Sequence, residues 1–314
     1  MKAIVVTDRT AGTAGMRLAE RPEPDAVKLA GLEGANYGDV VVEVHASGFT
    51  GNELEWPSTW FDRLGRDRTP TIPGHEVAGV VTSLSYGAAG LSVGQRVFGL
   101  TDWTRDGTLA EYVVVEARNL APLPGDIAFT AGAGVAMAGL TAWQGLFEHG
   151  HLRTGQSVLV HGAAGAVGSV ATQLARDGGA YVIGTGRADH RRAAVDFGAH
   201  EFVDLECDAL EDVGGVDLVL DAFGGDIGRR SAALVRAGGT LVSIVGGPEV
   251  RPAAGRVVDF VVVPDRAQLR EIAQRVRDGR LRPHIGRVST LDDAVDAFNS
   301  PQRISGKTVI GVRP

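Results

Sequence analysis

Residues 157–168 read Ser-Val-Leu-Val-His-Gly-Ala-Ala-Gly-Ala-Val-Gly, and this stretch decides the fold of the chain. Its β-forming residues run into a turn of glycine and alanine. The apolar spacing from Val167 to Leu174 predicts a helix after the turn, and Gly178 predicts where that helix stops. A second strand at residues 181–185 completes a βαβ unit of about 30 residues. The pattern is typical of a dinucleotide-binding turn.

The turn itself has the form Ala-x-Gly-x-x-Gly, a variant of the dinucleotide fingerprint. Residues with small side chains let the backbone approach a pyrophosphate. Free N–H groups and the helix dipole then stabilise the negative charge of the pyrophosphate. The alternative is an ordinary tight turn between a strand and a helix, which the surrounding strand–turn–helix–strand context disfavours. We therefore expect cofactor contacts along the backbone of Ala163, Ala164, Gly165, Ala166 and Val167.

The end of the second strand selects the nucleotide. An NAD site has a carboxylate there to bind the adenosine ribose, whereas this chain has Gly186 and Arg187, followed by Arg191 and Arg192. A small residue leaves room for a 2′-phosphate, which a guanidinium binds through two charge-assisted hydrogen bonds. We expect the 2′-phosphate site at Gly186, Arg187 and Arg191, so NADPH is favoured over NADH. A solvated helix face is the alternative for Arg191 and Arg192, and Asp189 is interpreted as a helix N-cap.

Composition limits the class of protein. The chain has 314 residues, a length that predicts two domains. Of these residues 22% are charged and 44% are hydrophobic, so we do not expect a disordered chain. A net charge of −7 without a basic block argues against nucleic acid. No apolar run is long enough to span a membrane, and the run from Lys2 to Thr7 predicts a strand rather than a signal peptide. The single cysteine, Cys207, excludes a thiolate-rich metal site. We expect a cytoplasmic protein.

Periodicity divides the chain into two kinds of region. Up to about residue 125, apolar and polar residues alternate with the two-residue period of a strand, as at 40–46 and 77–81. Turn-forming residues separate these segments. From about residue 126 strands and helices alternate, with buried parallel strands expected at 216–221 and 239–245 and a helix at 227–235. Beyond residue 255 come a helix from Arg266 to about Arg280 and a final strand at 307–312.

We therefore predict an α/β protein with two domains. A β-rich domain comprises residues 1–125 and 255–314, and a doubly wound parallel-sheet (Rossmann) domain at 126–254 is inserted into it. A cleft is expected between the two domains.

Together with the turn at residues 163–168, six motifs carry a resemblance that covers essentially the whole chain. The chain resembles the medium-chain dehydrogenase/reductase superfamily, and within it the zinc-independent quinone oxidoreductases and their enoyl-reductase relatives. The resemblance implies a GroES-like catalytic domain, an NADPH cofactor and a homodimer. The motifs are Pro73-Gly-His-Glu-Val-Ala-Gly-Val-Val81, Gly94-Gln-Arg-Val97, Gly107-Thr-Leu-Ala-Glu-Tyr112, Gly139-Leu-Thr-Ala142, Asp221-Ala-Phe-Gly-Gly225 and Gly306-Lys307.

Further site residues follow from this resemblance. We expect a cofactor contact at Thr141, and the resemblance adds Phe223, Val245 and Gly246 at strand ends beside the nicotinamide.

The resemblance also bears on zinc. Alcohol dehydrogenases of this superfamily hold a catalytic zinc through two cysteines and the histidine of a Gly-His-Glu motif. His75 is present here, but Thr50 and Met137 stand where the cysteines fall. Neither a hydroxyl nor a thioether replaces a thiolate on zinc, so no metal is expected.

Without zinc, alcohol oxidation loses its Lewis acid, whereas hydride transfer to an electron-poor acceptor needs less help. The leading hypothesis is an NADPH-dependent reductase of quinones or α,β-unsaturated carbonyls. The alternatives are a specialised biosynthetic enoyl or ketone reductase and a low-turnover NADPH-binding sensor. No side chain is assigned as a proton donor.

Candidate substrate contacts gather after Phe49. Thr50, Asn52 and Glu53 stand where the resembled family places residues near the nicotinamide. An aromatic group in an otherwise aromatic-poor chain suits stacking on a flat acceptor, while burial in the core of the β-rich domain is the alternative. The aromatic candidates are Trp56, Trp60 and Trp103.

Overall fold

The computed structural model describes residues 1–24, 37–247, 251–302 and 304–313. The chain forms two compact units. Unit 1 comprises Met1–Met137, Pro264–Arg277 and Ile285–Pro314, and unit 2 comprises Ala138–Val263 and Asp278–His284.

Both unit boundaries fall later in the chain than the sequence pattern indicates. The first lies inside a single helix, α3 (Phe129–Trp143), so no linker composition marks it. The return of Asp278–His284 to unit 2 depends on distant partners: the Gln173 side chain exchanges two hydrogen bonds with the Arg282 backbone, at 2.9 and 3.0 Å.

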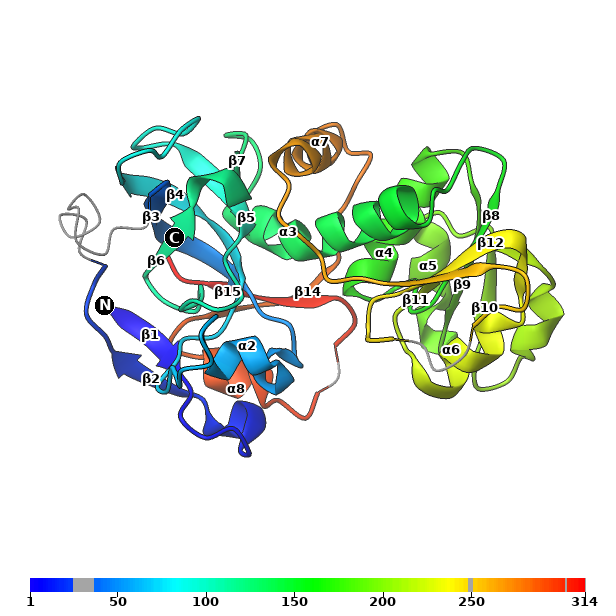
Figure 1. Cartoon of the computed structure of the whole chain (residues 1–314), viewed down its shortest axis with the longest axis horizontal. Coiled ribbons are helices and arrows are strands. Elements are labelled where there is room, and N and C mark those ends of the chain that lie inside the picture. The colour runs from blue at the N-terminus through cyan, green and yellow to red at the C-terminus, as the bar shows by residue number, and fades with distance from the viewer. Residues whose placement is uncertain (25–36, 248–250, 303, 314) are drawn as a thin grey trace. The chain divides into compact units, whose positions relative to one another are not determined.

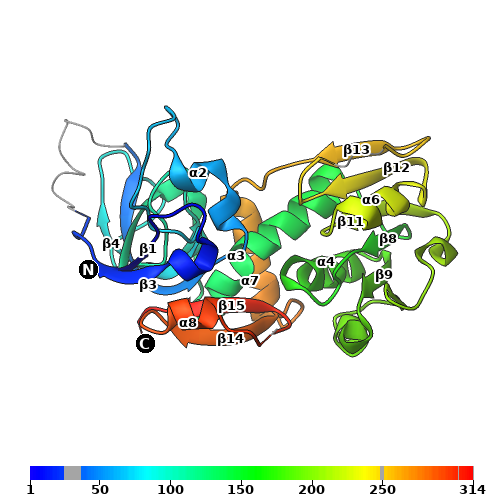
Figure 2. The same ribbon diagram turned by 90° about the horizontal axis from the view of Figure 1, so that it is seen from below.

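Unit 2 contains, within the described residues, a six-stranded sheet in which every pair of neighbours is parallel. Figure 2 shows its strands side by side from β13 to β9. The strand residues 158–160 are completely buried, as expected for a parallel strand covered on both faces. In spatial order the strands are β10 (Glu201–Asp204), β9 (Tyr181–Gly186), β8 (Ser157–Val160), β11 (Val216–Asp221), β12 (Val235–Ser243) and β13 (Arg256–Asp259).

Helices connect these strands. The helix expected at 227–235 begins at Gly225 and ends at Ala232, and residue 235 already belongs to β12. The N-cap interpretation of Asp189 is wrong, because this residue lies inside a 3-10 turn and its carboxylate accepts a hydrogen bond from Arg187. The helical elements of unit 2 after α3 are η4 (Gln144–His149, π-helical), α4 (Ala166–Asp177), η5 (Ala188–His190), α5 (Arg191–Asp196), η6 (Leu210–Val213) and α6 (Gly225–Ala232).

Unit 1 is β-rich, as predicted. Its described residues form a seven-stranded sheet and a two-stranded sheet. In Figure 1 the red strand β15 and the blue strand β3 are neighbours, and they pair antiparallel. The larger sheet runs β14 (Ile285–Thr290), β15 (Lys307–Gly311), β3 (Asp39–Gly48), β4 (Glu76–Leu84), β5 (Arg96–Leu100) and β7 (Leu120–Pro122), with β6 (Tyr112–Glu116) on β3, and the smaller one pairs β1 (Lys2–Val5) with β2 (Arg17–Glu20).

Short helical elements complete unit 1. They are η1 (Gly12–Gly15), η2 (Glu53–Glu55), α2 (Pro57–Trp60), η3 (Ala117–Asn119), α7 (Arg266–Arg277) and α8 (Ala294–Phe298). Seven valines of β3, β4 and β6 belong to one core cluster, and a second cluster includes residues of β1, α2 and α8. Across the described part of the chain, no helix is long and apolar enough to cross a membrane.

Candidate functional site

The glycine turn between β8 and α4 has room for backbone only. Gly162 has φ +65°, a conformation that side chains rarely adopt. A Cβ on Gly168 would lie 2.0 Å from the Gly162 carbonyl oxygen, and the Gly165 N–H donates to that oxygen at 2.7 Å. Glycine is therefore required at Gly162 and Gly168, and the small residues of the turn fit the close approach of a pyrophosphate.

Not every N–H of the turn faces outward. The Ala163 N–H donates to the Thr185 carbonyl at 3.0 Å. Ala163 therefore has no free backbone N–H to donate to a phosphate, although it lies in the turn as predicted. The helix α4 has Gly165 as its N-cap, and no side chain caps its first turn. The leading N–H groups of the helix, at Ala166 and Val167, are the donors that suit a phosphate.

The arginines at the end of β9 differ in how firmly they are held. Arg187 is 41% exposed and contacts Asp189 at 3.1 Å. Arg191 donates to the Phe202 carbonyl at 3.0 Å, which directs its guanidinium toward β10. Arg192 is 95% exposed. Arg187 thus follows Gly186 directly with its guanidinium paired to Asp189, whereas Arg192 is the most exposed of the three side chains.

The remaining predicted cofactor residues divide into two groups. Val245 and Gly246 line a cavity of about 190 Å³ at the carboxyl ends of β11 and β12. The half-exposed Phe223 ring lies 3.4 Å from where a Cβ on Gly162 would stand, so it lies beside the turn at that residue. Thr141, in contrast, is buried within α3.

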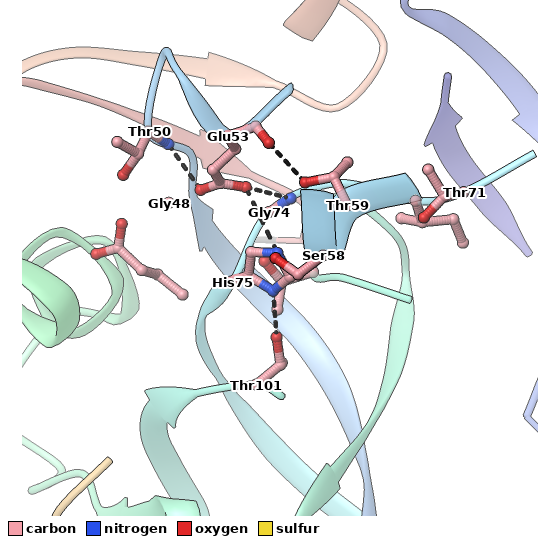
Figure 3. Close-up of polar contacts among 12 residues, drawn as sticks. Gly48, Thr50, Glu53, Ser58, Thr59, Thr71, Gly74, His75 and Thr101 are labelled. Atoms are coloured by element: carbon pink, nitrogen blue, oxygen red, sulfur yellow. Dashed lines mark hydrogen bonds and ion pairs between the residues drawn. The ribbon is translucent and has the colours of Figure 1, made fainter. Parts of the chain in front are cut away.

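Unit 1 holds a buried polar centre that the sequence did not predict (Figure 3). The Glu53 carboxyl accepts the N–H of Thr50 at 2.8 Å and the N–H of Gly74 at 2.9 Å. His75 Nε2 lies 4.0 Å from the same carboxyl, and its Nδ1 lies 2.9 Å from the Thr101 hydroxyl. Nε2 itself has no hydrogen-bond partner among the described residues.

Burial controls the charge of this centre. It raises the pKa of Glu53 to about 8, outweighing the two backbone N–H groups and Lys307, which favour the carboxylate. It lowers the pKa of His75 to about 3, with Arg68 acting in the same direction. At neutral pH both groups are therefore uncharged, and their contact is not an ion pair.

Two of the three predicted tryptophans lie against His75. Trp56 stacks on the imidazole at 6.1 Å between ring centroids, and Trp103 meets it edge-on at 5.0 Å. Both indoles are half-buried. Trp60 is 4% exposed, donates to the Leu54 carbonyl at 2.8 Å and belongs to the core cluster behind α2. Trp56 and Trp103 therefore form the aromatic surface of this centre, without Trp60.

Thr50 and Met137, the positions where the resemblance would place the zinc-binding cysteines, lie together here. The Thr50 hydroxyl donates to the Met137 sulfur at 3.5 Å, and the backbone N–H of Met137 donates to Glu76 at 3.2 Å. Glu76 pairs with Lys307, and both side chains are buried. A hydroxyl and a thioether do not fit zinc. In the part of the chain that the structure describes, no three His, Cys, Asp or Glu side chains group to hold a metal.

Glu53, which the resemblance places near the nicotinamide with Thr50 and Asn52, is completely buried in this polar centre, and its contact with His75 was not predicted. Glu53 lies three residues after Thr50, so its carboxyl reaches back to the Thr50 N–H. The other predicted polar contact, Asn52, is exposed, and its carbonyl accepts the N–H of Glu55 at 3.0 Å.

Comparison with known families and proteins gives a consistent result. The chain matches "Alcohol dehydrogenase GroES-like domain" at residues 36–125 and "Zinc-binding dehydrogenase" at residues 197–310. A quinone oxidoreductase of Mus musculus is 30% identical over 292 residues, covering 86% of this chain and 87% of that protein. A 2-methylene-furan-3-one reductase of Solanum lycopersicum is 33% identical over 266 residues, covering 79% of this chain and 66% of that protein.

A much longer protein is also similar. A spectinabilin polyketide synthase system protein of Streptomyces orinoci is 34% identical over 298 residues, covering 88% of this chain but only 13% of that protein. The chain thus spans less than two thirds of this relative and of the Solanum reductase. Among solved structures, a quinone oxidoreductase from Coxiella burnetii superposes with a TM-score of 0.86 at 24% identity over 100% of this chain and 99% of the other, which shows the same fold.

The chain belongs to the medium-chain dehydrogenase/reductase superfamily and is quinone oxidoreductase-like. Its fold implies a nicotinamide cofactor, NAD or NADP.

Proposed function

We propose that this protein is an NADPH-dependent reductase that transfers a hydride to a quinone or an α,β-unsaturated carbonyl without a metal. The observation that carries the proposal is the end of β9, where Gly186 and Arg187 stand in place of a ribose-binding carboxylate. An exposed guanidinium beside a residue without a side chain suits the 2′-phosphate of NADPH.

The residues of the chain have separate roles in this proposal. The bound cofactor supplies the hydride. The N–H groups of Ala166 and Val167 hold the pyrophosphate, and Arg187 holds the 2′-phosphate. Trp56 and Trp103, whose rings meet edge-on, offer apolar ring faces to a conjugated acceptor.

The metal-free part of the proposal depends on donor chemistry. Thr50 and Met137 offer a neutral hydroxyl and a thioether where thiolates are needed for zinc. A quinone, or a C=C bond conjugated to a carbonyl, spreads the incoming charge onto its own oxygen, so hydride transfer needs no Lewis acid.

A specialised biosynthetic enoyl reductase is the second candidate. The similarity to a polyketide synthase system protein and to a 2-methylene-furan-3-one reductase favours it. We also propose a homodimer, which the edge strand β13 of the unit 2 sheet supports because an edge offers unpaired backbone groups. A cytoplasmic location remains part of the proposal, and a low-turnover NADPH sensor remains the alternative to an enzyme.

The test is cofactor oxidation with a panel of acceptors: a benzoquinone, a naphthoquinone, an enone and an aldehyde, each with NADPH and with NADH. Turnover of quinone or enone that prefers NADPH and survives a chelator is the expected result. Loss of activity with the chelator contradicts the metal-free mechanism, and a preference for NADH contradicts the role of Arg187. Tight NADPH binding without turnover points to the sensor.

A further inference from the structure

A buried imidazole lies directly beneath the dinucleotide turn. His161 is the last residue before Gly162, and its side chain is completely buried. Its Nδ1 lies 2.8 Å from the Thr185 hydroxyl and its Nε2 lies 2.7 Å from the Ser231 hydroxyl. One side chain therefore joins the end of β8, the end of β9 and the helix α6.

The partners fix which nitrogen carries the proton. Ser231 donates its own hydrogen to the Ile227 carbonyl at 2.8 Å, so it accepts from the Nε2–H of His161. Nδ1 is then the acceptor for the Thr185 hydroxyl. Burial lowers the pKa of His161 to about 4, against the raising effect of the nearby Asp221 carboxylate, so the ring is neutral at physiological pH.

Thr185 connects this imidazole to the turn a second time. Its carbonyl accepts the Ala163 N–H at 3.0 Å, while its hydroxyl bonds to the ring of His161. Gly162, with φ +65°, thus lies between two residues that are both tied to Thr185. Thr185 also immediately precedes Gly186 and the proposed 2′-phosphate site, so the network couples the two phosphate-binding segments.

We propose that His161 is a positioning residue for the dinucleotide, holding the Gly162 turn and the end of β9 in the relative position that the two phosphate groups require. The inference rests on the proposed function, since it concerns how the proposed cofactor is bound. His161 touches no cofactor atom in this role and acts through Gly162 and Thr185.

Two variants test the proposal by equilibrium binding of NADPH to the whole protein, without turnover. Thr185→Val keeps the shape of the side chain but removes the bond to Nδ1, and His161→Leu removes both bonds. Each is expected to weaken NADPH binding roughly tenfold or more, since one buried hydrogen bond is worth about a factor of ten. In His161→Asn the shorter amide reaches Thr185, so this variant is expected to recover part of the lost NADPH affinity. In His161→Gln the longer amide reaches toward Ser231 instead, so no recovery is expected.

The matched control is Thr172→Val. Thr172 lies in α4 of the same unit, and its buried hydroxyl has no partner among the described residues. This variant is expected to bind NADPH as the wild type does. If His161→Leu fails to fold, Thr185→Val carries the test.

The outcomes separate the inference from the proposed function. A wild-type protein that does not bind NADPH overturns both. A wild-type protein that binds NADPH, together with Thr185→Val and His161→Leu variants of unchanged affinity, overturns the inference alone. Weakening by Thr172→Val equal to that by Thr185→Val also overturns it, because the effect then follows from any buried threonine. Weakening confined to the network variants, with partial recovery in His161→Asn, supports it.

Discussion

Burial shifts the pKa values of the neighbouring Glu53 and His75 side chains in opposite directions, because it disfavours the charged form of each group. Glu53 has a raised pKa of about 8, so the stability it contributes is complete below its ordinary pKa of 4.5 and is lost as pH rises through 8. His75 has a lowered pKa of about 3, so its contribution is complete above 6.5 and is lost as pH falls through 3.

The first prediction concerns Glu53→Gln. A glutamine does not titrate, so between about pH 4.5 and about pH 8 the wild type loses stability relative to the variant, by an amount on the order of a few kcal/mol. At low pH the variant is less stable, because an amide accepts only one of the two backbone N–H groups, at a cost of about 1–3 kcal/mol.

Denaturant unfolding of both proteins across this pH range measures the difference. Glu55→Gln is the control, since Glu55 is exposed on the same 3-10 turn, and its difference from wild type is expected to be small at every pH. If the difference in unfolding free energy between wild type and Glu53→Gln does not change with pH, Glu53 is not a neutral carboxyl in the folded protein.

The second prediction concerns Arg187→Ala. Removing a guanidinium from the 2′-phosphate is expected to weaken NADPH binding roughly tenfold to a hundredfold and to leave NADH binding almost unchanged. Fluorescence titration with both nucleotides measures this. Arg192→Ala, at a 95% exposed side chain, is the control. Equal losses for the two nucleotides would place the 2′-phosphate elsewhere.

Residue positions were predictable from sequence where they depend on chain neighbours and not where they depend on burial. The place of Gly186 and Arg187 at the end of a strand follows from the local pattern, while their role in cofactor binding stays a prediction. Nothing local distinguishes Trp56, which lies on His75, from Trp60, which the end of α2 turns into the core. The Glu53–His75 contact joins two segments that are distant in sequence, and its chemistry comes from desolvation that no motif encodes.

At the scale of elements, the turn between β8 and α4 depends on one glycine at its helical end. Gly168→Ala places a Cβ where the Gly162 carbonyl oxygen stands, 2.0 Å away, so the turn must open. We predict at least a tenfold loss of dinucleotide affinity for NADPH and NADH alike, because the pyrophosphate contacts are shared.

Equilibrium titration checks this, with Gly125→Ala as the control, since a Cβ there meets nothing within 4 Å and Gly125 has no positive φ. Unchanged affinity in Gly168→Ala contradicts the assignment of the turn.

Most elements were predictable because their signals are periodic. The βαβ unit carries both the apolar spacing and the glycine stop, and the structure confirms β8, α4 and β9. Element ends were less predictable. Residue 235 continues the apolar pattern of α6, yet it pairs with Val216 in the sheet, a contact that helical periodicity cannot exclude.

At the scale of the whole molecule, unit 1 is assembled from segments far apart in the chain. The buried Lys307–Glu76 pair joins β15 to β4, and the Met137 N–H on the same carboxylate adds α3. Burial raises the pKa of Glu76, so an unpaired carboxylate there is costly.

Lys307→Met is therefore expected to destabilise the protein by about 3–5 kcal/mol, and the double variant Glu76→Gln, Lys307→Met to recover part of that loss. Chemical denaturation followed by tryptophan fluorescence measures both. Lys2→Met, which breaks the exposed Lys2–Asp292 pair, is the control and is expected to change little. A double variant as unstable as the single one shows that the loss comes from Lys307 packing instead.

The two-domain class was predictable because the change from strand period to alternating strands and helices is strong. The boundaries were not, since α3 continues through one of them and Gln173 recruits Arg282 across more than a hundred residues.

The pairing of β15 with β3 has a consequence for synthesis on the ribosome. Strand β3 is synthesised early, but its partner β15 is translated only from residue 307 onward. Nearly all of unit 2 is translated after β3 and before β15. Unit 2 can thus begin to compact while the sheet of unit 1 still lacks a strand, and during that interval an apolar edge is exposed in the nascent chain. Slow translation of the last segment lengthens this vulnerable interval, so chaperone dependence is expected to rise with it.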